Sequence, residues 1–237
     1  LGERMDSYYD YTWQKSPDGK VILDANSGMP TRANTPSNLG HFNPDWTFGF
    51  NNTFKYKKFS LNIGIDGSIG GVMRSQVVEK MWWGGKHPNS VAYRDLEYAN
   101  PGTYYFVPDG VNYNPATGLY TPHTKAISFQ DWAQNYPYQA RVTQDESEEF
   151  ANVFDRTFIK LRSVVLEYDF SSLLNPKGMV KGFTANISAY NLAMWKKSKN
   201  LYSDPDFQIR SGRSGDIAND IQDPSSRWFG IGFNLKF

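Results

Sequence analysis

The chain has no cysteine and no hydrophobic run long enough to cross a membrane as a helix. Without thiols it has neither disulfide bonds nor cysteine-ligated zinc. Its mean hydropathy of −0.60 is that of a polar protein, and no segment approaches the ~18 apolar residues of a spanning helix. A helical membrane protein is therefore excluded. A membrane β-barrel is still allowed, because every second residue of its strands can be polar.

The chain also has little net charge and few histidines. The 25 basic and 24 acidic residues leave a formal charge of +1, which argues against nucleic acid, since that partner needs a clustered basic face. His41, His87 and His123 lack the spacing of metal ligands. Residues 212–215 lack the form of a nucleophile elbow, and the acidic run 145–149 is typical of a solvated loop. We predict no enzymatic activity, no metal site and no cofactor.

Aromatic residues, in contrast, make up 16% of the chain. Rings at this density suit the water–lipid interfaces of a membrane barrel or a binding surface. They also suit the core of a secreted β-sandwich, and on composition alone the sandwich is the better prediction.

The segment 229–237 favours the membrane barrel over the sandwich, because apolar residues alternate in it with small or polar residues without a break. Side chains alternate across a strand, so the segment has one apolar face and one small or polar face. Its length matches a tilted strand that crosses a bilayer. A soluble domain rarely leaves such a strand uncovered, since its edge would aggregate. The apolar face contains Phe229, Ile231, Phe233, Leu235 and Phe237.

Five further segments have a period of two, which predicts an all-β, antiparallel fold. Lys57 and Lys58 alone separate two of them, so these form a tight hairpin. The segment 156–170 changes phase at Ser163–Val164, which indicates a β-bulge or a change of environment. The six predicted strands lie near residues 5–14, 45–56, 59–69, 156–170, 180–194 and 227–237.

The connections between these strands are alternately long and short. Those near 15–44, 70–155 and 196–226 are long, and those at 57–58 and 171–179 are short. This alternation is typical of outer-membrane barrels, which have short periplasmic turns and long outer loops, whereas a sandwich has mostly short loops. Because lipid requires a closed sheet, we expect the remaining strands of the barrel to lie in sequence outside this chain.

The alternation also predicts which side chains meet lipid and which meet the barrel lumen. We expect Phe48, Ile63, Ile187 and Phe233 to face lipid near the middle of the membrane, and Asn62, Thr184 and Asn234 to face the lumen.

The connection 70–155 is too long for a bare loop. Near-helical spacing of apolar residues predicts a helix near 72–83, ended by two glycines. Aromatic residues are frequent from the end of this helix onward. They either contact a glycan or peptide or form the core of a folded loop, and both alternatives stay open. The candidate contact residues are Trp82, Trp83, Tyr104, Tyr105 and Trp132.

Several motifs, taken in order, resemble the C-terminal part of the SusC/RagA family of TonB-dependent outer-membrane transporters. The hairpin of this family is similar to Pro44-Asp45-Trp46-Thr47-Phe48-Gly49-Phe50-Asn51-Asn52 and to the turn within 56–61. The start of its large outer loop is similar to residues 66–71. The strands that follow in this family are similar to Phe158-Ile159-Lys160-Leu161-Arg162-Ser163-Val164 and then to residues 188–192 and 229–237. The short segment Leu1-Gly2-Glu3 before Ser7-Tyr8-Tyr9-Asp10-Tyr11 has a counterpart as well.

The resemblance implies a plugged barrel of about 22 strands in the bacterial outer membrane, of which this chain is the C-terminal part. It implies import of large nutrients, glycan or peptide, powered by TonB and covered by a SusD-like surface lipoprotein. The plug, the N-terminal strands and the TonB contact would lie upstream, and the aromatic residues of the long loop could also meet the lipoprotein. The acidic loop that often precedes the Trp46 strand in this family is reduced here, so no calcium site is predicted. The alternative function is a secreted, carbohydrate-binding β-sandwich module.

The resemblance also suggests a role for the final strand in barrel assembly. Outer-membrane barrels resemble one another in ending on an aromatic residue preceded by alternating apolar residues. An amphipathic, unpaired strand is a natural template for strand addition before a barrel closes. Phe229, Ile231, Phe233, Leu235 and Phe237 fit this assembly signal, although Phe237 could instead only anchor the inner interface.

Overall fold

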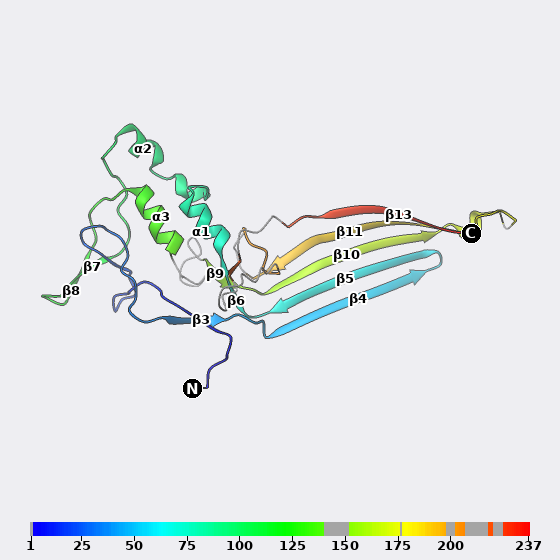
Figure 1. The fold of residues 1–237 in the computed structure, drawn as a ribbon, viewed down its shortest axis with the longest axis horizontal. Helices are drawn as coiled ribbons and strands as arrows, with labels where there is room; N and C mark the ends of the chain where they lie inside the picture. The colour runs from blue at the N-terminus through cyan, green and yellow to red at the C-terminus, as the bar shows by residue number, and fades with distance from the viewer. Residues whose placement is uncertain (1, 140–151, 176, 198–201, 207–217, 220–224) are drawn as a thin grey trace.

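The computed structural model describes residues 2–139, 152–175, 177–197, 202–206, 218–219 and 225–237. Its main feature is an antiparallel five-stranded sheet with the spatial order β13–β11–β10–β5–β4. The strands run along the long axis of the molecule, and smaller elements gather beyond one end (Figure 1). The predicted antiparallel all-β fold is confirmed. The five strands are β4 (Trp46–Tyr56), β5 (Phe59–Ile69), β10 (Phe158–Asp169), β11 (Gly182–Lys196) and β13 (Trp228–Lys236).

The register of the sheet places most apolar residues on one face and most polar residues on the other. Residues opposite each other in antiparallel strands share a face. Ile63 lies opposite Val164, and Ile187 lies opposite Ile231. On the other face, Thr184 lies opposite Asn234. A slip of one residue would move every side chain to the wrong face, so this pattern fixes the register.

One glycine on the apolar face is covered by an aromatic ring. Gly67 of β5 lies opposite Phe48 of β4. A Cβ atom at Gly67 would lie only 2.7 Å from Cζ of Phe48, so the ring occupies the space that another side chain would fill. Aromatic residues placed over strand glycines in this way help to fix the register of a sheet.

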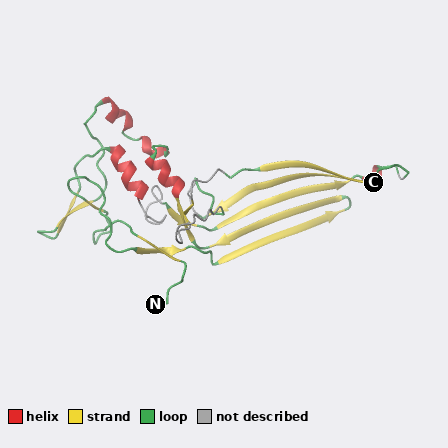
Figure 2. Cartoon of the chain, viewed as in Figure 1, coloured by secondary structure: helices red, strands yellow, loops and turns green. Residues whose placement is uncertain are grey.

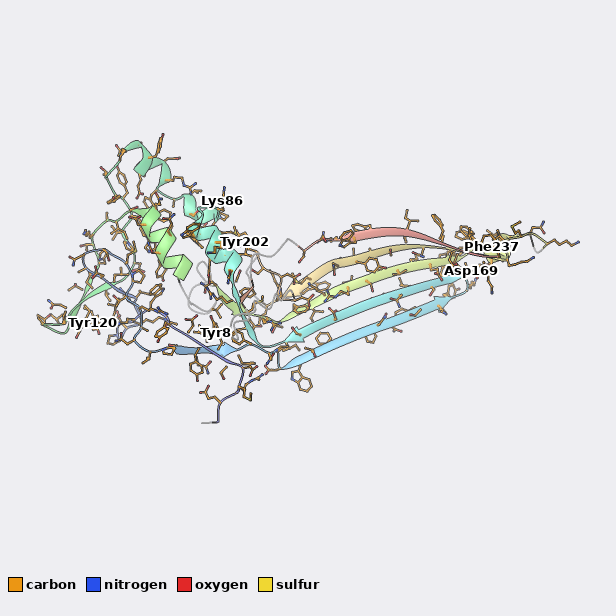
Figure 3. The ribbon with its side chains drawn as sticks, in the orientation of Figure 1. Tyr8, Lys86, Tyr120, Asp169, Tyr202 and Phe237 are labelled. Carbon is orange, nitrogen blue, oxygen red and sulfur yellow. The ribbon has the colours of Figure 1, made fainter. Side chains whose placement is uncertain are left out.

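The two ends of the sheet have different connections. Lys57 and Lys58 join β4 to β5, and Lys57 takes a left-handed conformation with φ of 53°, as the first residue of a tight hairpin turn does. Residues 170–181, which include the 3₁₀ turn η2 (Ser171–Leu173), join β10 to β11 at the same end. Figure 3 labels Asp169 and Phe237 close together there. The long connections all leave from the opposite end (Figure 1).

A bulge in β10 explains the phase change seen in the sequence. The register shifts between Leu161 and Ser163 against both neighbouring strands. Arg162 is the additional residue relative to β5, and β11 in turn has one additional residue relative to β10. The shift keeps Ile159 and Leu161 on the same face as Val164. The bulge prediction is confirmed, one residue earlier than expected.

The first predicted strand, near 5–14, is not part of the five-stranded sheet. Its central residues form β1 (Ser7–Asp10), which pairs with β3 (Ser37–His41) in a separate two-stranded sheet. Tyr8 is buried there, whereas Tyr9 is 47% exposed, so the side chain of Tyr8 and not that of Tyr9 faces the local core. Tyr8 packs against Phe42 with ring centroids 4.6 Å apart, and this local core holds the segment away from the large sheet.

The long connection between β5 and β10 folds into a small helical layer with short strands (Figure 2). The predicted helix 72–83 begins later than expected, because Val72–Ser75 forms β6 and pairs with β9 (Val153–Asp155). The helix α1 (Gln76–Trp83) starts where the Ser75 side chain accepts a hydrogen bond from the Val78 amide, which is a typical N-cap. The layer also contains η1 (Pro88–Val91), α2 (Arg94–Ala99) and α3 (Phe129–Gln139).

Short strands complete this end of the molecule. β2 (Ile22–Leu23) pairs with β7 (Val111–Asn114), which forms a hairpin with β8 (Leu119–Pro122). β12 (Ala218–Asn219) lies parallel to β6. Within the described ranges, none of the helices combines the length and apolar character needed to cross a membrane.

Candidate functional site

The apolar face of the five-stranded sheet exposes large hydrophobic side chains from neighbouring strands. Phe50 is 57% exposed, Ile187 57% and Phe233 69%. Monomeric soluble proteins rarely expose contiguous apolar patches beyond a few hundred Å². Phe48, Ile63, Ile187 and Phe233, the residues predicted to face lipid, all lie on this face by register.

The opposite face of the sheet is polar, as an aqueous lumen requires. Asn62 donates a hydrogen bond from Nδ2 to Oγ1 of Thr53 across the β4–β5 hairpin at 2.9 Å. Thr184 and Asn234 lie opposite each other on β11 and β13. The three residues predicted to face the lumen therefore share one face, opposite the apolar one.

Aromatic rings mark both ends of the apolar face. At the short-turn end, the ring of Tyr168 lies 4.6 Å from that of Phe59 and 4.5 Å from that of Phe170. At the loop end, Trp46 and Trp195 are 72% and 60% exposed. Rings at both interfaces are typical of membrane barrels.

Trp228 differs from the other tryptophans at the loop end of the sheet. It lies opposite Tyr190 and so belongs to the polar face. Trp228 therefore lies at the loop end of β13 but not on the apolar face.

A network of ion pairs ties a loop to the polar face near the loop end. Lys160 Nζ lies 2.6 Å from Asp204 Oδ2 and 3.0 Å from Asp206 Oδ2. Arg162 Nε binds Asp66 Oδ2 at 2.7 Å, and its Nη2 binds Asp206 Oδ2 at 2.9 Å. Burial opposes ionisation of Asp204, but hydrogen bonds from Lys160 and Ser225 outweigh it and lower the pKa of Asp204.

The sequence alone does not indicate this network. The available signal was the opposite charge of Asp66 on β5 and Lys160 and Arg162 on β10, all at positions of the polar face. Their partners Asp204 and Asp206 come from a distant part of the chain, and only the fold brings them together.

A second candidate site is a cleft of about 860 Å³ in the helical layer. Its walls come from α1, α2, the start of α3 and the turn between α1 and η1. Small-molecule sites usually have volumes of about 300–1,000 Å³. The rim includes the exposed rings of Trp83, Tyr98 and Tyr104.

The five aromatic candidates divide into core and surface residues. Trp82 and Trp132 are only 1% and 7% exposed and pack in one hydrophobic core. Their burial favours a role in loop packing, although Trp82 also borders the cleft. Trp83 and Tyr104, 54% and 47% exposed, line the cleft, and Tyr105, 41% exposed, lies outside its lining. Contact by these three stays a prediction.

Comparisons with known proteins agree with this architecture. No family model matches the sequence. TonB-dependent receptor P3 of Formosa agariphila is 22% identical over 259 aligned residues, which cover 100% of this chain and 22% of that protein. A chain of the RagAB peptide importer matches with a TM-score of 0.52 in its 'open-open' state and 0.53 in its 'closed-closed' state, each at 16% identity. This chain has the fold of a part of the RagAB importer.

The shared fold extends over nearly the whole chain. Both RagAB matches cover 98% of this chain but only 22% and 23% of the matched chains. The chain thus spans about a fifth of the length of the proteins that it matches. The predicted resemblance to SusC/RagA-type transporters is confirmed, and the alternative of a β-sandwich is wrong: within the described residues, no second sheet packs on the five-stranded one.

Proposed function

We propose that the chain forms part of the wall and outer loops of a TonB-dependent importer in the bacterial outer membrane. The observation that carries this proposal is the exposed apolar face, which continues in register across five antiparallel strands. Lipid would cover such a face without any protein partner. The opposite, polar face would then line a water-filled lumen.

The arrangement of connections sets the proposed orientation. Short turns lie on the periplasmic side of outer-membrane barrels and long loops lie outside. The turn at Lys57 and Lys58 and the residue Phe237 would therefore lie at the periplasmic side. The helical layer and the ion-paired loop would face the outside, where a nutrient arrives.

The proposed cargo is a large nutrient, glycan or peptide, and the proposed role is non-enzymatic. The matched proteins are described as a receptor and as a peptide importer. We further propose a SusD-like surface lipoprotein as a partner of the outer loops. The plug, the remaining barrel strands and the contact with TonB would belong to the rest of the transporter.

Cell fractionation of the full transporter tests the proposal. We expect the protein in the outer-membrane fraction, extracted only by detergent and running as a heat-modifiable band on gels. Deletion of its gene should abolish growth on the imported nutrient. Recovery of the folded protein in the aqueous fraction without detergent would contradict the proposal.

A further inference from the structure

Five backbone amides along the rim of the cleft in the helical layer already donate hydrogen bonds. In the turn after α1, the amides of Gly84, Gly85 and Lys86 donate to carbonyl oxygens of α1 at 2.7–3.1 Å. At the start of α3, the amide of Phe129 donates to Glu97 Oε1 at 2.9 Å and that of Asp131 to Ser128 Oγ at 3.2 Å. A ligand there must therefore be recognised mainly by side chains.

Three aromatic rings on the rim are exposed although a core lies directly beneath them. Trp83 is 54%, Tyr98 87% and Tyr104 47% exposed, whereas Phe129 in the floor is 6% exposed. Aromatic rings combine a large apolar area with low conformational cost on binding. They offer flat surfaces for a ligand that is itself apolar on its faces.

The charged groups of the cleft balance each other. Lys86 and Arg94 contribute two positive charges, and Glu97 and Asp131 contribute two negative charges. Arg94 is held in place, because its Nη2 donates to the carbonyl oxygens of Gly85 and Ser90, each at 3.2 Å. Such planar, oriented groups form paired hydrogen bonds with good geometry.

From these features we infer that the cleft binds a neutral oligosaccharide. Pyranose rings have apolar C–H faces that stack on aromatic rings and hydroxyl edges that bind planar charged and amide groups, such as those of Gln130. A peptide that binds by strand addition needs an exposed sheet edge, and the walls of this cleft, formed by helices and turns, offer none. Balanced charge favours neither an anionic nor a cationic ligand. The inference rests on the proposed function, since it requires the helical layer to face the nutrient.

A binding assay with ring-exchange variants tests this inference. The purified full transporter in detergent is applied to an array of neutral hexasaccharides and to a library of random hexapeptides. We expect binding to one class of neutral hexasaccharide. Trp83→Leu and Tyr104→Ala should each weaken it on the order of tenfold, whereas Trp83→Phe should restore most of it, because the phenyl ring keeps the stacking surface.

Tyr120→Ala is the matched control. Tyr120 is also an exposed ring, but it lies on the β7–β8 hairpin, well away from Lys86 at the cleft (Figure 3). This variant should bind as the parent protein does. Heat-modifiable migration of each variant shows that it is folded.

Two results would overturn the inference. One is the absence of any hexasaccharide binding that depends on Trp83, and the other is Trp83-dependent binding of hexapeptides in place of sugars. Either result leaves the proposed function intact as long as the transporter fractionates with the outer membrane. Failure of fractionation would count against the proposed function itself.

Discussion

Ile187 and Thr184 lie on the same strand, β11, but face opposite sides of the sheet. Ile187→Arg would place a charge on the face proposed to meet lipid, and we expect it to lower the free energy of unfolding by about 2–4 kcal/mol. Thr184→Arg, on the polar face, should change it little. Urea unfolding of the transporter in lipid vesicles measures both. Equal tolerance at the two positions would contradict the assignment of the faces.

Two adjacent tryptophans give a second contrast between single residues. Trp82 is 1% exposed and stacks on His87 with ring centroids 4.4 Å apart, whereas Trp83 is 54% exposed. Trp82→Ala should destabilise the helical layer by about 3–5 kcal/mol, and Trp83→Ala should cost well under 1 kcal/mol. Hydrogen exchange at the amides of α1 and α3 reports the difference. Similar exchange in the two variants would argue against the observed core.

The burial of Trp82 and the exposure of Trp83 could not be predicted from the sequence. Both tryptophans end a short amphipathic helix, and neighbouring helix positions differ by only about 100° in direction. Which ring is buried depends on Phe129 and Trp132, which come from a helix some fifty residues later in the chain. The sequence therefore identifies an aromatic region but does not separate its core from its surface.

Among the structural elements, the loop around Asp204 and Asp206 is expected to respond to acid. The pKa of Asp204 is lowered in the folded state, so its ion pair contributes stability above the ordinary carboxylate value of 3.8. That contribution is lost as the pH falls through the lower, folded-state value. We expect the loop to become sensitive to an acid-active protease in this range. Asp204→Asn should be cleaved similarly at neutral and acid pH, and unchanged pH dependence in this variant would contradict the role of Asp204.

The bulge in β10 gives a second prediction for an element. Insertion of one alanine after Arg162 would shift the preceding part of β10 by one residue, so Ile159 and Leu161 would move to the polar face. We expect almost no assembled barrel, measured as the heat-modifiable fraction in outer membranes. Arg162→Ala keeps the register and loses only the bonds to Asp66 and Asp206, so it should still assemble. Normal assembly of the insertion variant would contradict the role of the β10 register.

Elements with strong alternation were predictable, and elements set by distant contacts were not. Phe229 to Leu235 and the phase change in β10 could be placed from the sequence, since a period of two and its interruption are local signals. The position of β1 could not be predicted, because the packing of Tyr8 on Phe42 determines which face of the strand is buried. The start of α1 was also misplaced, because Val72–Ser75 pairs with β9, which lies about eighty residues later.

For the whole molecule, the two outermost strands of the sheet, β4 and β13, each pair on one side only within the described residues. Unpaired strand edges are templates for association, and lipid tolerates none. Expressed alone and refolded in detergent, residues 1–237 should therefore form mixed oligomers, as measured by light scattering after size-exclusion chromatography. The full transporter should be homogeneous. A single monomeric species of the isolated chain would contradict the need for further strands.

The β4–β5 hairpin also has a consequence for the order of assembly. Its strands are joined by two residues, and the contact of Phe48 with Gly67 fixes their register near the far end of the hairpin. Both features are local in sequence, so little chain entropy is lost in forming them. The hairpin can thus reach its native pairing early in barrel folding, whereas the pairing of β10 with β5 must close the long connection that contains the helical layer. Barrel assembly in this part of the molecule would then start from a preformed hairpin. The ion pairs of the loop with Lys160 and Arg162 of β10 would form last.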